Sequence, residues 1–425
     1  MDQVARVLDR KVKRLFPAGA VVRAELLRDD DHPGLLKVRV VVPSTEDLSA
    51  WAALHRERME EVRRGLSVRL PSARLLEFTS DAPDAAVISM PDDGSLVAER
   101  LTSREIVVKA LALLRENYVF PELAGQVAAS IETRLAAGEY DDLDEITLAE
   151  LLTGHLQEAS GDKHLRVRFV GGIGPVPRAA GRPAGIADGR EARRPKGRLR
   201  GRLDNFGIHR VERLDGNVGY LDLRGVPVPE NAGPAIAAAM ELVSGTYALI
   251  IDLRHNGGGS PHGVAYWCSY LLPEEPVRLN DIFRADTGET RQFWSLPYLP
   301  GTRYTDRPVY VLTSSHTFSG GEDLCYTLQA LGRAEVIGET TGGGAHPTKP
   351  FPISAAMRIG IPFARSVSPI TGTNWQGTGV IPDTPAAAGD AYGVAYAKAL
   401  RHVAELGAVP PPVADEARDA LAALT

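Results

Sequence analysis

The chain has 425 residues, enough for two or three domains, and its composition, 44% hydrophobic and 24% charged, is that of an ordinary globular protein. The formal net charge of −6 argues against a general nucleic-acid binder, and no stretch reaches the apolar length that a membrane span requires. The two cysteines form no metal spacing or disulfide framework, and the N-terminus has no apolar signal region, so we expect a cytoplasmic location.

Residues 1–97 have the pattern of a small α+β domain. Residues 21–27 and 35–42 are rich in β-forming side chains, and the acidic turn DDDHPG between them predicts a hairpin. Residues 48–66 have helical spacing, and residues 73–78 predict another strand. Nothing here is typical of a catalytic site, so we interpret the region as an accessory domain that could mediate protein contacts.

Residues 98–170 predict a helical domain. Thr102 and Glu105 form a capping-box pattern ahead of an apolar run. Apolar residues then recur every four positions through residues 123–135, which indicates a second helix. The sequence GDKHLRVRFV alternates apolar and basic residues and predicts a half-buried strand with His164 at its start.

The rest of the chain predicts a linker, an α/β core and a helical tail. Residues 171–205 are rich in Gly, Pro, Ala and Arg, and basic tracts without aromatic residues are usually solvated linkers rather than nucleic-acid sites. Strand and helix patterns alternate through residues 206–395, which predicts a layered α/β core. Residues 396–425 predict a C-terminal helix and tail. The predicted core strands include residues 218–223, 248–253 and 309–312.

The stretch VLTSSHTFSGGEDL contains five hydroxyl side chains between a predicted strand and a predicted helix. Ser319 and Glu322 form an S-x-x-E capping box, so this serine could serve only as a helix cap. The same position suits a nucleophile, because its oxygen lies near the positive end of a helix and the N–H of Gly320 can approach a reacting carbonyl. Gly257, Gly258 and Gly259, in the loop RHNGGGS, lack side chains and could supply the second donor of an oxyanion hole.

A serine nucleophile also needs a base. The chain has ten histidines, and spacing alone does not choose among the candidates His164, His255, His262, His316 and His346. His255 and His262 are separated by a glycine loop, with no carboxylate to complete a metal site. The glycine runs lack the G-K-[ST] of a phosphate loop. We therefore expect neither a metal nor another cofactor.

Four motifs, in the order LIIDLRHNGGG, TSSHTFSGGEDL, GETTGGGAHP and SPITGTNWQGTGVIPD, resemble the tail-specific (C-terminal processing) serine protease family. The resemblance is to the branch that includes interphotoreceptor retinoid-binding protein and the tricorn protease core. It covers about residues 100–395 and implies a crotonase-like, ClpP-like α/β core of stacked ββα units. It also implies Ser319 as nucleophile, His164 as base, and the N–H groups of Gly320 and of Gly257 or Gly258 as oxyanion donors.

Two departures from the family pattern concern the base. The first lysine after the serine is Lys349, which does not suit a serine–lysine dyad. Where the tricorn-like branch has a glutamate beside its histidine, this chain has Gln376, whose amide cannot stabilise an imidazolium as an anion would. We therefore expect reduced activity that Gln376→Glu would raise, unless Asp162, Glu322 or Asp323 already supplies the charge.

The sequence therefore predicts a serine endopeptidase of the C-terminal processing type that cleaves a peptide or protein substrate through an acyl-enzyme. Two alternatives stay open. One is a weakly active or non-catalytic binder of an apolar, retinoid-like or lipid-like ligand. The other is a peptide-tailoring hydrolase or cyclase of a biosynthetic pathway. None of the three requires nucleic acid or a membrane as a partner.

Overall fold

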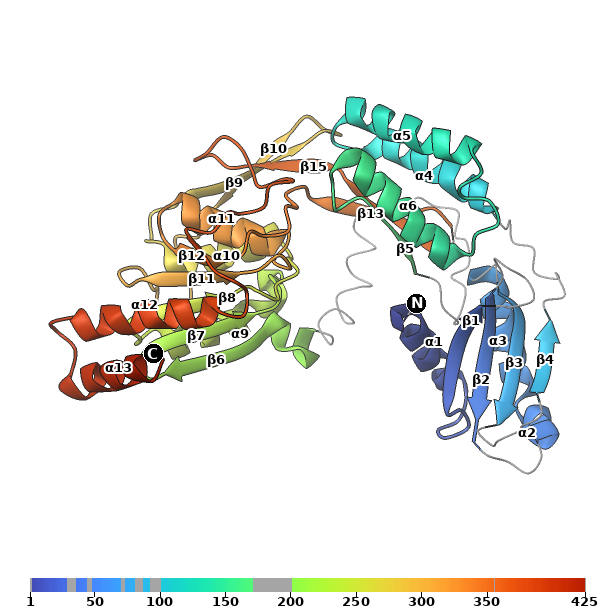
Figure 1. Cartoon of the computed structure of the whole chain (residues 1–425), viewed down its shortest axis with the longest axis horizontal. Coiled ribbons are helices and arrows are strands. Elements are labelled where there is room, and N and C mark those ends of the chain that lie inside the picture. Colours follow the sequence, from blue (N-terminus) through green and yellow to red (C-terminus); the bar gives the residue numbers. More distant parts are fainter. Residues whose placement is uncertain are drawn as a thin grey trace. The chain divides into compact units, whose positions relative to one another are not determined.

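The computed structural model of the chain describes residues 2–28, 36–43, 48–69, 73–80, 87–91, 101–170, 201–354 and 356–424. The chain divides into two compact units (Figure 1). The first comprises residues 1–182 and 348–362, and the second comprises residues 183–347 and 363–425. The predicted turn DDDHPG and most of the predicted linker lie outside the described residues.

The first unit begins with a four-stranded sheet in the order β1-β2-β3-β4. β1 and β2 are antiparallel, as the predicted hairpin requires, whereas β2 and β3 are parallel. Alternate residues of β2 are buried, and Val38 and Val40 share a core with Leu8 and Val12 of the first helix. The elements are α1 (Asp2–Leu15), β1 (Arg23–Arg28), β2 (Leu36–Val42), α2 (Leu48–Leu54), α3 (Arg56–Arg69), β3 (Ala73–Ser80) and β4 (Val87–Pro91).

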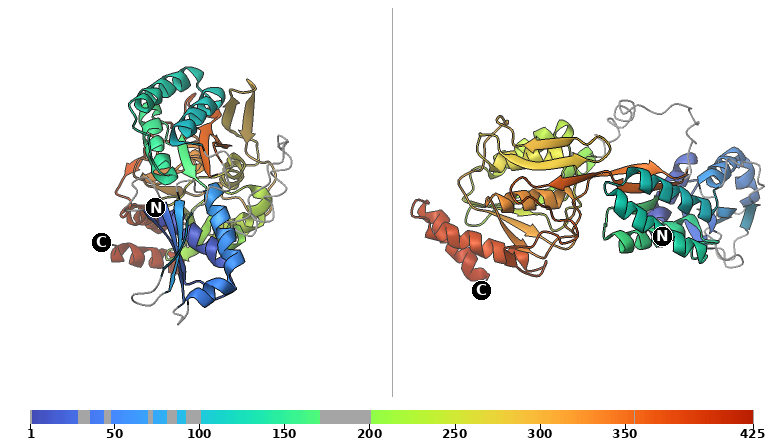
Figure 2. Two further views of the ribbon diagram at one scale, coloured as in Figure 1. Left: turned by 90° about the vertical axis from the view of Figure 1, so that its right-hand side faces the viewer. Right: turned by 90° about the horizontal axis from the view of Figure 1, so that it is seen from above.

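The second part of the first unit is helical, as predicted. The capping box at the start of α4 is confirmed: the Glu105 N–H donates to the Thr102 hydroxyl, and the Thr102 N–H donates to the Glu105 carboxylate. The helices pack on an antiparallel sheet, β13-β14-β5, whose strands come from distant parts of the sequence (Figure 2). The elements are α4 (Ser103–Asn117), α5 (Pro121–Ala136), α6 (Glu145–Ser160), β5 (Arg166–Phe169), β13 (Thr348–Pro352) and β14 (Met357–Pro362).

The second unit is built around a six-stranded sheet in the order β16-β12-β11-β8-β7-β6. Its strands are parallel except that β6 is antiparallel to β7. The strands are β6 (Ile208–Leu214), β7 (Val218–Leu223), β8 (Ala248–Asp252), β11 (Val309–Thr313), β12 (Glu335–Gly338) and β16 (Thr384–Pro385).

Helices cover both faces of this sheet, which is why β8 is an unbroken buried run (Figure 1). Leu249 and Ile251 join the core formed with α9, α10 and α11, whereas Ala248 and Ile250 join the core formed with α12 and α13. The covering helices are α9 (Pro229–Val243), α10 (Pro261–Leu271), α11 (Gly320–Ala330), α12 (Ala391–Glu405) and α13 (Pro411–Ala423).

A smaller antiparallel sheet, β10-β9-β15, and a short helical turn, η1, complete the second unit. The predicted mixed α/β class is confirmed, and β6, β7 and α9 form a ββα unit. In the part of the chain that the structure describes, no helix is long and apolar enough to cross a membrane. The remaining elements are η1 (Asn205–Gly207), β9 (Arg278–Arg284), β10 (Thr290–Trp294) and β15 (Ala364–Val367).

Candidate active site

Ser319 lies in the turn between β11 and α11, at the N-cap position of the helix. Its backbone has φ 55° and ψ −120°, a conformation that residues other than glycine rarely adopt and that stores strain. Such strain persists only where the surroundings hold the residue in place. The turn therefore presents a half-buried serine in a fixed orientation at the start of a helix.

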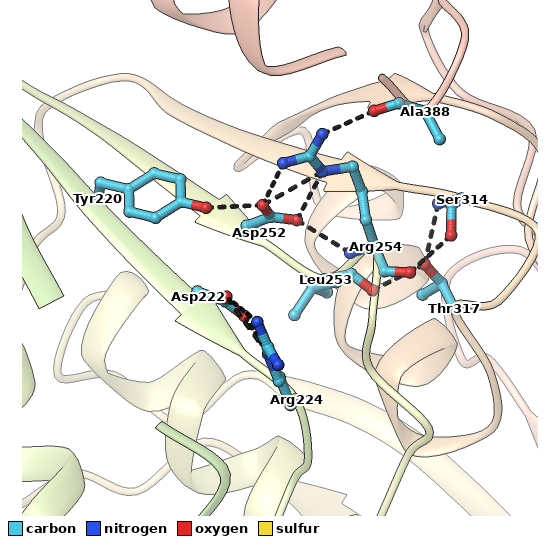
Figure 3. A network of polar contacts seen from close by, with 9 residues as sticks. All are labelled: Tyr220, Asp222, Arg224, Asp252, Leu253, Arg254, Ser314, Thr317 and Ala388. Atoms are coloured by element: carbon cyan, nitrogen blue, oxygen red, sulfur yellow. Dashed lines mark hydrogen bonds and ion pairs between the residues drawn. The ribbon is translucent and has the colours of Figure 1, made fainter. Parts of the chain in front are cut away.

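Three of the other four hydroxyl groups of this stretch have structural partners. Thr313 donates to the carbonyl of Glu339, and Thr317 donates to the carbonyl of Leu253. Ser314 donates to the carbonyl of Arg254 at 2.6 Å. The bonds of Ser314 and Thr317 fasten the loop after β11 to the end of β8 (Figure 3), whereas the bond of Thr313 reaches the residue after β12. Ser315 is exposed, so Ser319 is the hydroxyl best placed for chemistry.

A buried ion pair supports the end of β8 (Figure 3). The Arg254 guanidinium binds both oxygens of Asp252, and the Tyr220 hydroxyl donates to the same carboxylate at 2.7 Å. Burial alone would raise the pKa of Asp252, but the hydrogen bonds from Arg254 and Tyr220 outweigh it and lower the pKa. Arg254 also donates to the carbonyl of Ala388, which ties the end of β8 to the segment before α12.

The glycine loop that follows β8 is in direct backbone contact with the Ser319 turn. A Cβ atom added to Gly258, which has φ 96°, would lie 2.8 Å from the Ser319 Cβ and 2.9 Å from the Gly320 nitrogen. A Cβ atom added to Gly320 would lie 2.8 Å from the Gly259 nitrogen. No side chain fits at either position, so the glycines are required for close approach of the two loops.

Asn256, which is fully buried, sets the shape of the glycine loop. Its side-chain nitrogen donates to the carbonyl of Leu223, and its Oδ1 accepts from the Gly258 N–H at 2.9 Å. Its backbone carbonyl accepts from the Phe318 N–H at 3.0 Å. Sequence reasoning missed this residue, although an asparagine before three glycines is a typical turn signal.

The backbone donors at this junction are not equivalent. The Gly258 N–H is already bonded to Asn256. Within the described ranges, the N–H groups of Gly257 and Gly320 donate to no protein atom. Of Gly257 and Gly258, the two glycines that the family resemblance implies as second donor, Gly257 is therefore the one whose N–H has no acceptor in the described protein.

Glu322 joins the Ser319 turn to the loop after β12. Its buried carboxylate accepts from the Ser319 N–H at 2.7 Å, the Thr341 hydroxyl at 2.5 Å, and the N–H groups of Gly343 and Gly344 at 2.6 and 2.8 Å. Burial raises the pKa of Glu322, and these four hydrogen bonds oppose the rise. Since both oxygens are occupied, Glu322 supports the Ser319 turn and the loop after β12 rather than a histidine.

Gln376 holds the same loop from its other end. Its Oε1 accepts from the Ala345 N–H at 2.8 Å, and its own N–H donates to Asn374 Oδ1 at 2.9 Å. The neighbouring His346 is buried, whereas His316, close to Ser319 in sequence, is exposed. The second unit thus brings Ser319, the glycine loop and Gln376 into one set of connected loops.

His164 belongs to the first unit, just before β5. The backbone N–H of His164 donates to Asp162 Oδ1 at 2.9 Å, and the ring Nδ1 of His164 lies 3.7 Å from the same oxygen. Asp162 is 1% exposed, and its Oδ2 accepts from the Tyr118 hydroxyl at 3.2 Å. Burial and the Asp162 charge raise the pKa of Tyr118 well above its usual value, so Tyr118 keeps its proton as a donor. Sequence reasoning named Asp162 but missed Tyr118.

His255 and His262, which flank the glycine loop, are both exposed, and the His262 ring packs against Phe293. Over the residues that the structure describes, no group of three or more His, Cys, Asp or Glu side chains could hold a metal ion.

In comparisons with known proteins, two family models match parts of this chain. The model for peptidase family S41 matches residues 217–386, and the model for the N-terminal domain of peptidase S41 in eukaryotic interphotoreceptor retinoid-binding protein matches residues 93–187. A carboxyl-terminal-processing protease from Synechocystis sp. is 28% identical over 155 residues, which is 36% of this chain. The chain spans 34% of that relative's length, which is about a third.

Matches to solved structures have low sequence identity and TM-scores below 0.5. A Parabacteroides merdae protein assigned as a peptidase has a TM-score of 0.48 and 19% identity, covering 68% of this chain and 90% of its own. The photosystem II D1 C-terminal processing protease has a TM-score of 0.43 and 17% identity, covering 68% and 94%. The tricorn protease has a TM-score of 0.44 and 13% identity, covering 80% and 38%.

The Glu322→Gln variant should lose stability. An amide nitrogen in place of one oxygen would face two donors, so the free energy of unfolding should fall by about 2 kcal/mol or more. Urea unfolding of wild type and variant measures the change. Glu230→Gln, an exposed residue at the start of α9, is the matched control and should behave as wild type. An equally stable Glu322→Gln variant would show that the carboxylate does not hold the turn.

Asp323, also buried, should make stability depend on pH. Burial raises its pKa from 3.8 to about 6, although hydrogen bonds from Asn280 and Thr327 oppose the rise. Between these two values the unfolded chain releases the proton while the folded chain keeps it. The free energy of unfolding should therefore fall as the pH rises from about 4 to about 6, by about 3 kcal/mol at most.

Urea unfolding across that pH range tests this dependence. Asp323→Asn should make the fall smaller, leaving the part due to Glu322, whereas Asp286→Asn, which changes a more exposed carboxyl on the β9–β10 hairpin, should retain it in full. The same pH dependence in wild type and Asp323→Asn would contradict the assignment.

Proposed function

We propose that the chain is a serine peptidase with Ser319 as nucleophile, since the model for peptidase family S41 matches residues 217–386 and the model for the N-terminal domain of such peptidases matches residues 93–187. The observation that carries the proposal is the strained Ser319 turn, held in backbone contact with a glycine loop. A helix cap alone needs neither the strain nor the contact. The arrangement suits a nucleophile placed beside two backbone donors.

In the proposed reaction, Ser319 Oγ attacks the carbonyl carbon of a peptide bond and passes its proton to the His164 imidazole. The N–H groups of Gly320 and Gly257 bind the oxyanion that forms. The C–N bond then breaks, and the imidazolium gives the proton to the leaving amine. Water hydrolyses the acyl-enzyme by the same steps: it loses a proton to His164, and Ser319 regains one as it leaves.

We propose that Asp162 supplies the carboxylate beside His164, in place of the glutamate that the family pattern has at position 376. Asp162 Oδ1 is 3.7 Å from His164 Nδ1. The carboxylate accepts hydrogen bonds from the Tyr118 hydroxyl and from the backbone N–H of His164. A carboxylate there favours the imidazolium that forms when the serine loses its proton. Gln376 accepts from the Ala345 N–H and so positions the loop beside Ser319. On this assignment Gln376→Glu brings no large gain, since the histidine already has its anion.

Ser319 should be the one serine that a fluorophosphonate probe modifies. Only a serine with a base and oxyanion donors reacts rapidly with such a probe. Intact-protein mass spectrometry should show one adduct on wild type, none on Ser319→Ala, and an unchanged adduct on the control Ser315→Ala. Labelling of Ser319→Ala at the wild-type rate would exclude Ser319. No labelling of wild type would favour a binding protein that does not catalyse.

Asp162→Asn should reduce kcat on a peptide pool by about a hundredfold or more, with a smaller effect on KM. Loss of the anion lowers the pKa of the histidine, so the acidic limb of the kcat/KM profile should move to lower pH. Tyr118→Phe keeps the carboxylate and should cost less. His164→Ala should abolish turnover, whereas His346→Ala should retain it. An unchanged rate and pH profile for Asp162→Asn would refute the assignment of the anion.

A further inference from the structure

Helix α1 and strand β1 of the first unit border a groove of about 940 Å³. Figure 1 shows the two elements beside each other. The volume lies at the upper end of the range of pockets that bind ligands, and nothing in the proposed chemistry of Ser319 uses this space. The lining residues are Ala5, Arg6, Asp9 and Arg10 of α1 and Arg23, Ala24, Glu25, Leu26 and Leu27 of β1.

The groove follows the outer edge of the four-stranded sheet. Neighbouring side chains of a strand point to opposite faces, so a groove lined by five successive residues runs along the edge of the strand, where its backbone lies. β2 pairs with one side of β1, and among the described residues no strand pairs with the other side. Such an edge carries backbone N–H and C=O groups to which a further strand can pair.

The N–H of Ala24 shows which backbone groups of β1 point toward the groove. It donates to Asp9 Oδ1 at 2.8 Å and therefore points away from β2. Backbone groups along an antiparallel strand alternate between its two sides, so the N–H and C=O of Leu26 point to the same side as those of Ala24. Asp9 takes only the Ala24 N–H, which leaves the Ala24 carbonyl and both groups of Leu26 for an added strand.

An added strand would direct every second side chain toward α1. The side chains of Ala24 and Leu26 are buried in the core that α1 shares, so they mark the face of the sheet on which α1 lies. Glu25 and Leu27 alternate with them and lie on the opposite face. The side chains of the added strand on the α1 face therefore meet the lining residues of that helix.

The charges of the groove favour acidic side chains on the α1 face. The two lining carboxylates have cation partners, since Asp9 pairs with the lysine one turn along α1 at 3.1 Å and Glu25 pairs with Arg23 at 2.7 Å. Arg6 and Arg10, both exposed, add further positive charge. α1 as a whole carries five basic and two acidic residues, in a chain whose formal net charge is −6. Carboxylates on an incoming strand complement this charge.

We propose that this groove is a docking site for an extended, acidic segment of another protein, which adds to β1 as a further strand with its carboxylates toward α1. Main-chain hydrogen bonds to β1 supply affinity, and Arg6 and Arg10 select acidic side chains. The site is separate from the proposed chemistry of Ser319 and does not depend on it. It gives the N-terminal sheet a role in recognising a partner.

A binding experiment tests the charge preference on the full chain. The probes are two fluorescein-labelled nine-residue peptides, in which Thr alternates with Glu or with Lys. The protein is Ser319→Ala, so that hydrolysis of the probes does not interfere. Fluorescence anisotropy should show the Glu peptide binding at least about tenfold more tightly than the Lys peptide. Equal binding, or tighter binding of the Lys peptide, would overturn the docking site.

Backbone methylation separates strand addition from charge attraction alone. Two further Glu peptides carry N-methyl groups either on every Glu nitrogen or on every Thr nitrogen. Alternate N–H groups of an added strand face β1, so one of these peptides should bind at least about tenfold more weakly, whereas the other should bind as the unmethylated peptide does. Equal binding of the two methylated peptides would overturn strand addition and would leave α1 only as a surface that attracts anionic polymers or membranes.

A charge reversal in the groove tests where the Glu peptide binds. Arg10→Glu, added to Ser319→Ala, should weaken binding by about fivefold or more, because it replaces an attraction by a repulsion. Arg56→Glu is the matched control: it makes the same change in net charge at an exposed position, the first residue of α3, which does not line the groove. An unchanged affinity in Arg10→Glu, or an equal loss in both variants, would overturn the assignment of the site to this groove.

Discussion

The backbone contact between the glycine loop and the Ser319 turn is the constraint on which the rest of the candidate site depends. β8 and β11 are adjacent parallel strands, so the loops that leave their carboxyl ends meet at one edge of the sheet. The two loops approach so closely that Gly258 and Gly320 have no room for a Cβ atom. This contact sets the position of Ser319 relative to the backbone donors that its chemistry would need.

Such a contact brings polar backbone groups into a buried region, and two side chains satisfy them. Asn256 binds the backbone on the glycine-loop side, and Glu322 binds the Ser319 turn and the loop after β12. A buried carboxylate is costly unless hydrogen bonds compensate its charge, and Glu322 accepts four of them. The hydrogen bonds of Asn256 and Glu322 hold the strained backbone of Ser319 in place, because a turn without them would relax.

The proposed catalytic groups are divided between the two units. The first unit holds His164 with Asp162 and Tyr118, and the second holds the nucleophile and its backbone donors. In the proposed mechanism the histidine has its anion on its own loop, so a glutamine at position 376 is compatible with activity. Gln376 can then position the loop beside Ser319 by accepting a hydrogen bond from the Ala345 N–H.

The sequence by itself determined the locally encoded features. The apolar runs of β8 and β11, the capping box at Thr102 and the helical spacing of residues 123–135 each depend on neighbours within a few positions, and each was predicted. The sequence also named Ser319 and the glycine loop, because a serine before two glycines and three glycines after a strand are patterns of adjacent residues.

Tertiary structure alone decided what depends on distant segments. β5 pairs with β14, nearly two hundred positions later in the chain, and no local pattern encodes that partner. Spacing could not show that Asn256 takes the Gly258 N–H, that Glu322 serves three backbone donors, or that Tyr118 reaches Asp162. Each of these contacts depends on where folding brings a side chain, because a hydrogen bond requires an approach of about 3 Å that sequence separation does not determine.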